Sequence, residues 1–160
     1  MTTVTLPTVC PTPGRYSVAP GRSFAELTAH YGPLATLRRR ITLTGASLTV
    51  PEFASGSGAG DDRPVFRFDL AGTMKASLVS EHVEPLADGR QLQLTADLDV
   101  RGVAFPVLLR LRVVRRTEGG LVVVGAARIP YRLLRRATGF RLPWARPATR
   151  LRLLLAAEFA

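Results

Sequence analysis

The sequence has one cysteine, Cys10, and two histidines, His30 and His82, among its 160 residues. One cysteine excludes an internal disulfide, and these three residues are too few for a Cys/His zinc site. The longest uncharged apolar stretch, 119–127, is far shorter than the roughly 20 residues of a membrane-spanning helix. The first residues lack the basic region and apolar core of a secretory signal. We therefore expect a cytoplasmic protein without a structural metal.

Lysine is almost absent, with Lys75 alone against 21 arginines, and the positive charge is concentrated late in the chain. Residues 1–100 contain 9 basic and 10 acidic residues, whereas residues 101–160 contain 13 basic and 2 acidic ones. Such a region is typical of a surface for nucleic acid or an anionic membrane. It is also typical of strands whose outward positions are arginine, and most of these arginines alternate with apolar residues. Aromatic residues are scarce among them, which disfavours a stacking platform for single-stranded nucleic acid.

Long helical patterns are also missing, and short alternating segments take their place. The clearest segment, 91–101, alternates polar residues with Leu92, Leu94, Ala96, Leu98 and Val100. Similar alternation over 65–70, 105–113 and 150–159, with Gly and Pro turn signals between segments, predicts seven to nine strands. The predicted fold class is all-β, and the length of the strands favours an antiparallel barrel of about eight of them.

The segments without alternation are predicted as loops. Residues 1–13, with three prolines, are predicted as a flexible N-terminal arm, and 14–160 as one barrel domain. The Gly/Ser-rich stretch within 51–64 is typical of a flexible loop. Residues 130–147, which contain Pro130, Gly139, Pro143 and Pro147, are expected to be irregular. Gly45 within a strand pattern indicates a bulge or bend, and Arg101-Gly102 a turn.

Several short motifs in 14–159 resemble the YceI-like family. The opening Gly14–Phe24 is similar to the family's first strand, and Ala96–Val107 to its strand, Arg-Gly turn and Pro-Val hairpin. Ala127–Arg132 and Thr138–Phe140 are weaker similarities, and the family's usual His-Ser pair is Arg22-Ser23 here. The resemblance implies an up-and-down lipocalin-like barrel that binds a long polyisoprenoid chain in its interior.

In a closed barrel, the apolar faces of the strands would converge on the interior. The predicted ligand-binding residues there are Phe66, Phe68, Leu92, Leu94, Leu98, Leu109, Leu111, Val113, Val123, Leu153 and Leu155. Burying hydrocarbon gains about 0.8 kcal/mol per CH₂, so this wall would hold a long apolar chain without a polar anchor. The small residues Ala96, Gly125 and Ala127 would leave room for it. A core packed by its own side chains would have the same pattern, and both interpretations stay open.

Catalytic motifs are lacking. No nucleophile motif accompanies either histidine, and Asp61-Asp62 has the surroundings of a solvated turn. Gly56, Gly58 and Gly60 are not followed by the Lys-Ser/Thr of a phosphate loop. We therefore predict no enzymatic activity, no cofactor and no metal site.

The resulting hypothesis is a non-enzymatic lipid-binding protein that holds an isoprenoid or similar apolar chain inside a β-barrel. Four arginines near the barrel mouth would contact an anionic head group or a membrane surface: Arg132, Arg135, Arg136 and Arg141. The alternative is a binding module for an anionic partner, nucleic acid or a membrane surface, that uses the Arg-rich C-terminal region. Nucleic acid is the less favoured of these partners, and the sequence leaves a homodimer open.

Overall fold

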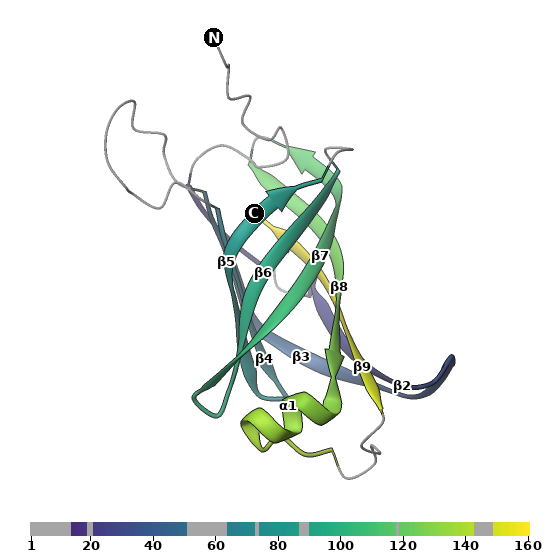
Figure 1. Ribbon diagram of the computed structural model, residues 1–160. Helices are drawn as coiled ribbons and strands as arrows, with labels where there is room; N and C mark the ends of the chain where they lie inside the picture. Colours follow the sequence, from purple (N-terminus) through teal and green to yellow (C-terminus); the bar gives the residue numbers. More distant parts are fainter. Residues whose placement is uncertain are drawn as a thin grey trace.

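The computed structural model describes residues 14–18, 21–50, 64–72, 74–86, 90–117, 119–142 and 149–160. The predicted arm at 1–13 with Cys10 lies outside these residues, as do Asp61-Asp62 and the glycines at 56, 58 and 60. The described residues form nine strands and one short helix (Figure 1). Their bounds are β1 Gly14–Ser17, β2 Phe24–Tyr31, β3 Leu34–Val50, β4 Val65–Ala71, β5 Ala76–Pro85, β6 Gln91–Val100, β7 Val103–Thr117, β8 Gly120–Pro130, α1 Tyr131–Thr138 and β9 Arg150–Phe159.

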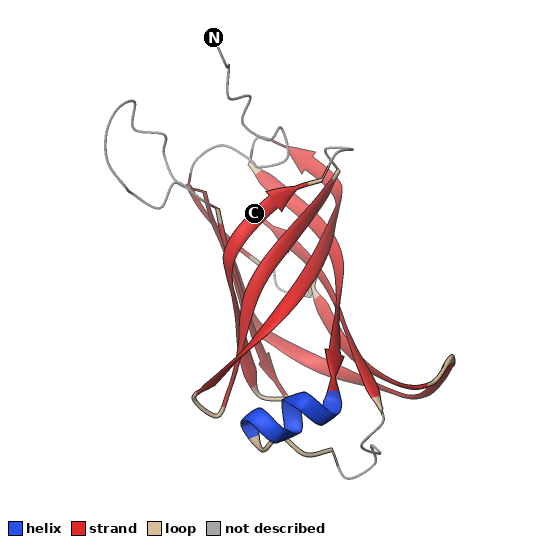
Figure 2. Ribbon diagram, viewed as in Figure 1, coloured by secondary structure: helices blue, strands red, loops and turns tan. Residues whose placement is uncertain are grey.

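The strands close into an antiparallel eight-stranded barrel (Figure 2). Each strand from β2 to β9 pairs with the next one in the chain, and β9 pairs back with β2. The short β1 continues the ring beyond β2, because it pairs with 47–50 of β3 whereas β2 pairs with 34–41. Ser17 and Ala160 exchange two backbone hydrogen bonds of 3.2 and 2.9 Å, which tie β1 to the end of β9. The predicted all-β, up-and-down barrel is confirmed.

The alternation of residue types decides which side of each strand faces inward. In β6 the residues at 92, 94, 96, 98 and 100 are buried and those between them are partly or fully exposed. β9 repeats the pattern, with every second residue from Leu151 to Phe159 buried. Because side chains of a strand point alternately to its two faces, these residues meet in one core inside the barrel.

Local irregularities bend the barrel wall. Arg101 and Gly102 have φ angles of 54° and 80°, as a two-residue type I′ hairpin turn requires. The Gly102 amide donates a 3.0 Å hydrogen bond to the Asp99 carboxylate. A bulge interrupts the β3–β4 pairing between Leu43 and Gly45, and bulges increase local twist. The predicted turn and the predicted bulge at Gly45 are both confirmed.

Within the segment 130–147, which was expected to be irregular, residues 131–138 form the helix α1, and 143–147 lie outside the described residues. Pro130 is its N-cap, and Gly139, with φ of 73°, is its C-cap. Proline suits the first turn of a helix and glycine its end, so the residues taken as helix breakers instead mark the boundaries of α1. The helix lies at one end of the barrel, against β7 and β8 (Figure 1). It therefore covers part of the opening at that end.

Candidate functional site

The barrel interior contains the predicted ligand-binding residues. Ten of the eleven are buried, and Val113 is partly buried and packed against the core. They come from β4, β6, β7, β8 and β9, so they surround the interior from several sides. Their placement inside the barrel follows the prediction.

The interior is almost free of polar groups. No charged side chain is buried among the described residues. Ser80 on β5 is buried, and its hydroxyl accepts a 2.8 Å hydrogen bond from the Phe66 amide. In the described part of the chain, no buried side-chain nitrogen or oxygen lacks a partner. Such an environment suits hydrocarbon and excludes charged or strongly polar ligands, because an unpaired buried polar group is costly.

Side chains of the wall pack against one another across the interior. Phe159 meets Phe66 and Phe68 edge to face, with ring centroids 5.8 and 6.0 Å away. At Gly125, an added Cβ would lie 2.3 Å from Leu111 Cδ2. The expectation that Gly125 leaves room for a ligand is therefore wrong, because Leu111 already occupies that space. An incoming chain would have to displace such side chains.

At the α1 end, apolar residues close the barrel, and charged side chains lie next to them. Tyr131 and Leu142 are buried there, and the Tyr131 hydroxyl accepts a 2.7 Å hydrogen bond from the Leu142 amide. Beside them lies an open pocket of about 850 Å³, lined by residues that include Lys75, Arg101 and Arg141. The apolar closure belongs to the core, whereas the pocket is accessible from solvent.

The four predicted head-group arginines lie on α1 and just after it. Arg132 and Arg136 are exposed, Arg135 is half-buried, and Arg141 is exposed and lines the pocket described above. On the other face of α1, Tyr131, Leu134 and Thr138 are buried. The structure thus places these arginines at one barrel end, on the solvent side of a helix whose apolar side faces the core.

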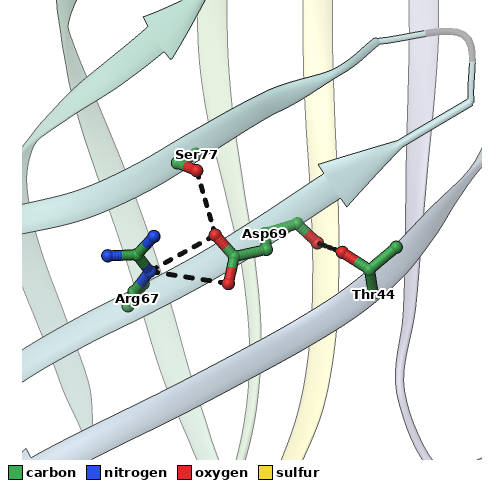
Figure 3. Close-up of polar contacts among 4 residues, drawn as sticks. All are labelled: Thr44, Arg67, Asp69 and Ser77. Atoms are coloured by element: carbon green, nitrogen blue, oxygen red, sulfur yellow. Dashed lines mark hydrogen bonds and ion pairs between the residues drawn. The ribbon is translucent and has the colours of Figure 1, made fainter.

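A polar network on the outer wall was not predicted. The Asp69 carboxylate accepts hydrogen bonds from Ser77 Oγ at 2.9 Å and from Arg67 Nε at 3.3 Å (Figure 3). Arg67 Nε also lies 3.5 Å from the second carboxylate oxygen, and the Asp69 carbonyl accepts a hydrogen bond of 3.1 Å from Thr44 Oγ1. These contacts join β3, β4 and β5 next to the bulge at Gly45. The Asp69 carboxylate and the hydroxyls of Ser77 and Thr44 all have partners within the network, which indicates a structural role.

A carboxyl pair on the outer wall was also missed. Glu81 lies where a bulge interrupts the β5–β6 pairing, and Asp97 lies on β6. A hydrogen bond with Asp97, together with the repulsion between the two carboxylates, raises the pKa of Glu81 above its ordinary value of 4.5. No spacing in the sequence points to this pair, because the bulge creates it.

The histidines lie apart from each other in the strand order. His30 is half-buried on β2 and His82 is exposed on β5, and these strands are not neighbours. Among the described residues, no group of three or more His, Cys, Asp or Glu side chains could hold a metal ion. No described helix is both long enough and apolar enough to cross a membrane.

Comparison with known proteins supports the fold. The chain is similar to the crystal structure of BcnA from Burkholderia cenocepacia, with a TM-score of 0.52 and 13% sequence identity. The similarity covers 88% of this chain and 98% of BcnA. No protein-family model and no curated protein sequence matches the chain. At this identity, the similarity establishes the barrel fold.

Proposed function

We propose that this protein is a YceI-like, non-enzymatic lipid-binding barrel that holds an isoprenoid or similar long apolar chain in its interior. The observation that carries the proposal is a closed barrel with no buried charge among its described residues. Each CH₂ moved from water to such a site gains about 0.8 kcal/mol. The fold shared with BcnA and the motif resemblance at 96–107 support it.

Binding in this site requires the interior to open. The aromatic cluster of Phe66, Phe68 and Phe159 and the contact of Leu111 with Gly125 fill part of the space. We propose that an apolar chain enters at the α1 end, where Tyr131, Leu134 and Leu142 form the closure. Movement of one short helix disturbs fewer hydrogen bonds than separation of two paired strands. The exposed arginines of α1 would hold this end against an anionic membrane surface during transfer.

The test enlarges the interior and asks whether an apolar ligand fills the space. Native mass spectrometry of gently purified protein, and uptake of a fluorescent polyene, should both detect a bound apolar chain. The variant F68A should lose about 3–5 kcal/mol of stability through the cavity it creates. The polyene should then raise the melting temperature of F68A more than that of the unchanged protein.

A matched control distinguishes binding of the polyene in the interior from binding on the surface. Phe24 is 45% exposed on β2, so F24A removes the same group from the outside. Equal stabilisation of both variants by the polyene would place binding outside the barrel. Absence of uptake by the unchanged protein would overturn the proposal. If F68A does not fold, F68L offers the same comparison with a smaller change.

A further inference from the structure

A second group of basic side chains lies on the outer wall, on β8, β9 and β2 rather than on α1. Arg128 on β8 is directly opposite Arg152 on β9, and Arg150 on β9 is opposite His30 on β2. Arg152 is also opposite Thr28, whose other neighbour in register is Arg38 on β3. One row across these four adjacent strands therefore contains Arg128, Arg152 and Arg38. All of these arginines are exposed.

Three of these arginines, together with His30, line a pocket. It has a volume of about 510 Å³ and is lined by His30, Arg128, Arg150 and Arg152, with Ile129 and Leu151 among its apolar residues. Thr28, although it is on the outer face of β2, is only 4% exposed between Arg38 and Arg152. The basic groups thus border one concave site instead of being spread over a flat wall.

The positive charge of this pocket has no acidic partner in the described chain. Elsewhere on the wall, Arg22 pairs with Glu158 and Arg67 with Asp69. Among the described residues, no such pair involves Arg128, Arg150 or Arg152. Glu26, the acidic residue on β2, instead accepts a 3.5 Å hydrogen bond from the Thr28 hydroxyl. Like charges directly opposite on neighbouring strands destabilise a sheet, so Arg128 and Arg152 carry a cost that the described residues do not offset.

We propose that this pocket binds a phosphate-bearing anion with at least two negative charges, a diphosphate or a phosphomonoester. Each guanidinium offers a planar pair of donors that matches phosphate oxygens, and several arginines favour a multiply charged ligand over a single carboxylate. Pro130, the N-cap of the neighbouring α1, lines the pocket, and the first turn of α1 has neither a side-chain cap nor an acidic residue. Its positive end therefore adds to the same field. This inference does not depend on lipid binding inside the barrel.

The test is a calorimetric titration of the full chain with sodium diphosphate at low ionic strength. Sulfate serves as a comparison anion. We expect saturable binding at one site. The double variant R128Q/R152Q should weaken it by about tenfold or more, because the opposed pair of guanidinium forks is lost. R112Q/R116Q is the matched control: it removes the same charge from exposed positions on β7 outside the pocket, and binding should stay within about twofold. R128K/R152K keeps the charge without the forks and should fall between the two.

Stability without ligand gives a second readout. R128Q/R152Q relieves the repulsion, so in phosphate-free buffer its melting temperature should equal or exceed that of the unchanged protein. Diphosphate should raise the melting temperature of the unchanged protein and of R112Q/R116Q, but not that of R128Q/R152Q. Equal weakening by both double variants, or no saturable binding, would overturn the proposal. A drop in the melting temperature of R128Q/R152Q would assign these arginines a structural role and would also overturn it.

The ligand phosphate could be free in solution or belong to a lipid, and vesicles separate these sources. At matched surface charge, phosphatidic acid presents a phosphomonoester and phosphatidylglycerol a phosphodiester. A lipid source predicts stronger binding to phosphatidic acid, and R128Q/R152Q should abolish that preference. A soluble source predicts diphosphate binding with no preference between the vesicles. Polyene uptake by R128Q/R152Q should be unchanged in either case, so failure here is distinct from failure of the lipid-binding proposal.

Discussion

Glu81 and Asp97 show how a single bulge can make stability depend on pH. The pKa of Glu81 is raised, mainly because a hydrogen bond with Asp97 and repulsion from that group favour the protonated form. As the pH rises through 4.5, the unfolded chain therefore releases this proton before the folded chain does. The contribution of Glu81 to stability is present at acidic pH and is lost as the pH rises through the raised pKa.

We expect E81Q to remove this loss, because a glutamine amide keeps a donor for Asp97 and carries no charge. The variant should melt at a higher temperature than the unchanged protein at pH 7, and the difference should vanish below about pH 4. Thermal unfolding followed by circular dichroism across this range measures it. E84Q, at an exposed position of the same strand, is the control. A pH-independent effect of E81Q would contradict the raised pKa of Glu81.

At Gly125, two neighbouring atoms occupy the space that a side chain would need. An added Cβ would meet Leu111 Cδ2 at 2.3 Å and the Arg110 carbonyl oxygen at 2.6 Å. The leucine could turn away, but the backbone oxygen could not move without distorting the β7–β8 pairing. We expect G125A to destabilise the fold by about 1–3 kcal/mol, as overpacking of a core does.

Urea unfolding would measure the effect of G125A, with G119A as the matched control. No atom of the described residues lies within 4 Å of a Cβ at Gly119 and its φ is not positive, so that change should cost less than about 0.5 kcal/mol. An equal loss in both variants would mean that backbone freedom, not crowding, explains Gly125. The sequence predicted that this position faces inward, since alternation fixes the face. It could not show that Leu111 leans over it, because that contact joins two strands.

The helix α1 could not be predicted from the sequence, whereas the strands could. The strands were predictable because a period of two persists over ten residues in β6 and β9. α1 has only eight residues, and Pro130 and Gly139 at its ends were taken as signs of irregular structure. The spacing of Tyr131, Leu134 and Thr138, at i, i+3 and i+7, was the available signal. Even that signal does not predict that the helix lies against β7 and β8.

We expect Y131F to loosen the closed end of the barrel. The Tyr131 hydroxyl accepts a hydrogen bond from the buried Leu142 amide, and loss of this acceptor should cost about 1–3 kcal/mol. Hydrogen exchange should accelerate at Phe140–Leu142 before it does so in the strands, and polyene uptake should become faster. L133A, at a position 54% exposed on α1, should change neither rate. Uniform acceleration in all strands would show that Tyr131 supports the whole barrel and not its closure alone.

At the scale of the whole molecule, the strand pairing that closes the barrel also separates the apolar side chains from the charged ones. Among the described strands, up-and-down pairing from β2 to β9 closes the ring without a free edge, and it collects the apolar faces inside. The positive charge remains outside, and at the α1 end it stands beside the apolar closure. The sequence predicted the ring and the excess of arginine. The arrangement of the arginines around this end depends on α1 and on the strand register, which only the fold supplies.

This arrangement predicts that the α1 end binds anionic membranes. Arg132 and Arg136 are four residues apart on the exposed face of α1, next to the exposed Leu133. Each arginine near an anionic surface gains about 1 kcal/mol, so R132Q/R136Q should weaken binding to phosphatidylglycerol vesicles by about 30-fold. R112Q/R116Q removes the same charge from the wall and should have a smaller effect. Sedimentation with vesicles at increasing salt measures both, and binding of the unchanged protein should fall as salt rises. Equal binding to neutral and anionic vesicles would contradict this orientation, because the attraction of arginine to a membrane depends on the negative charge of its lipids.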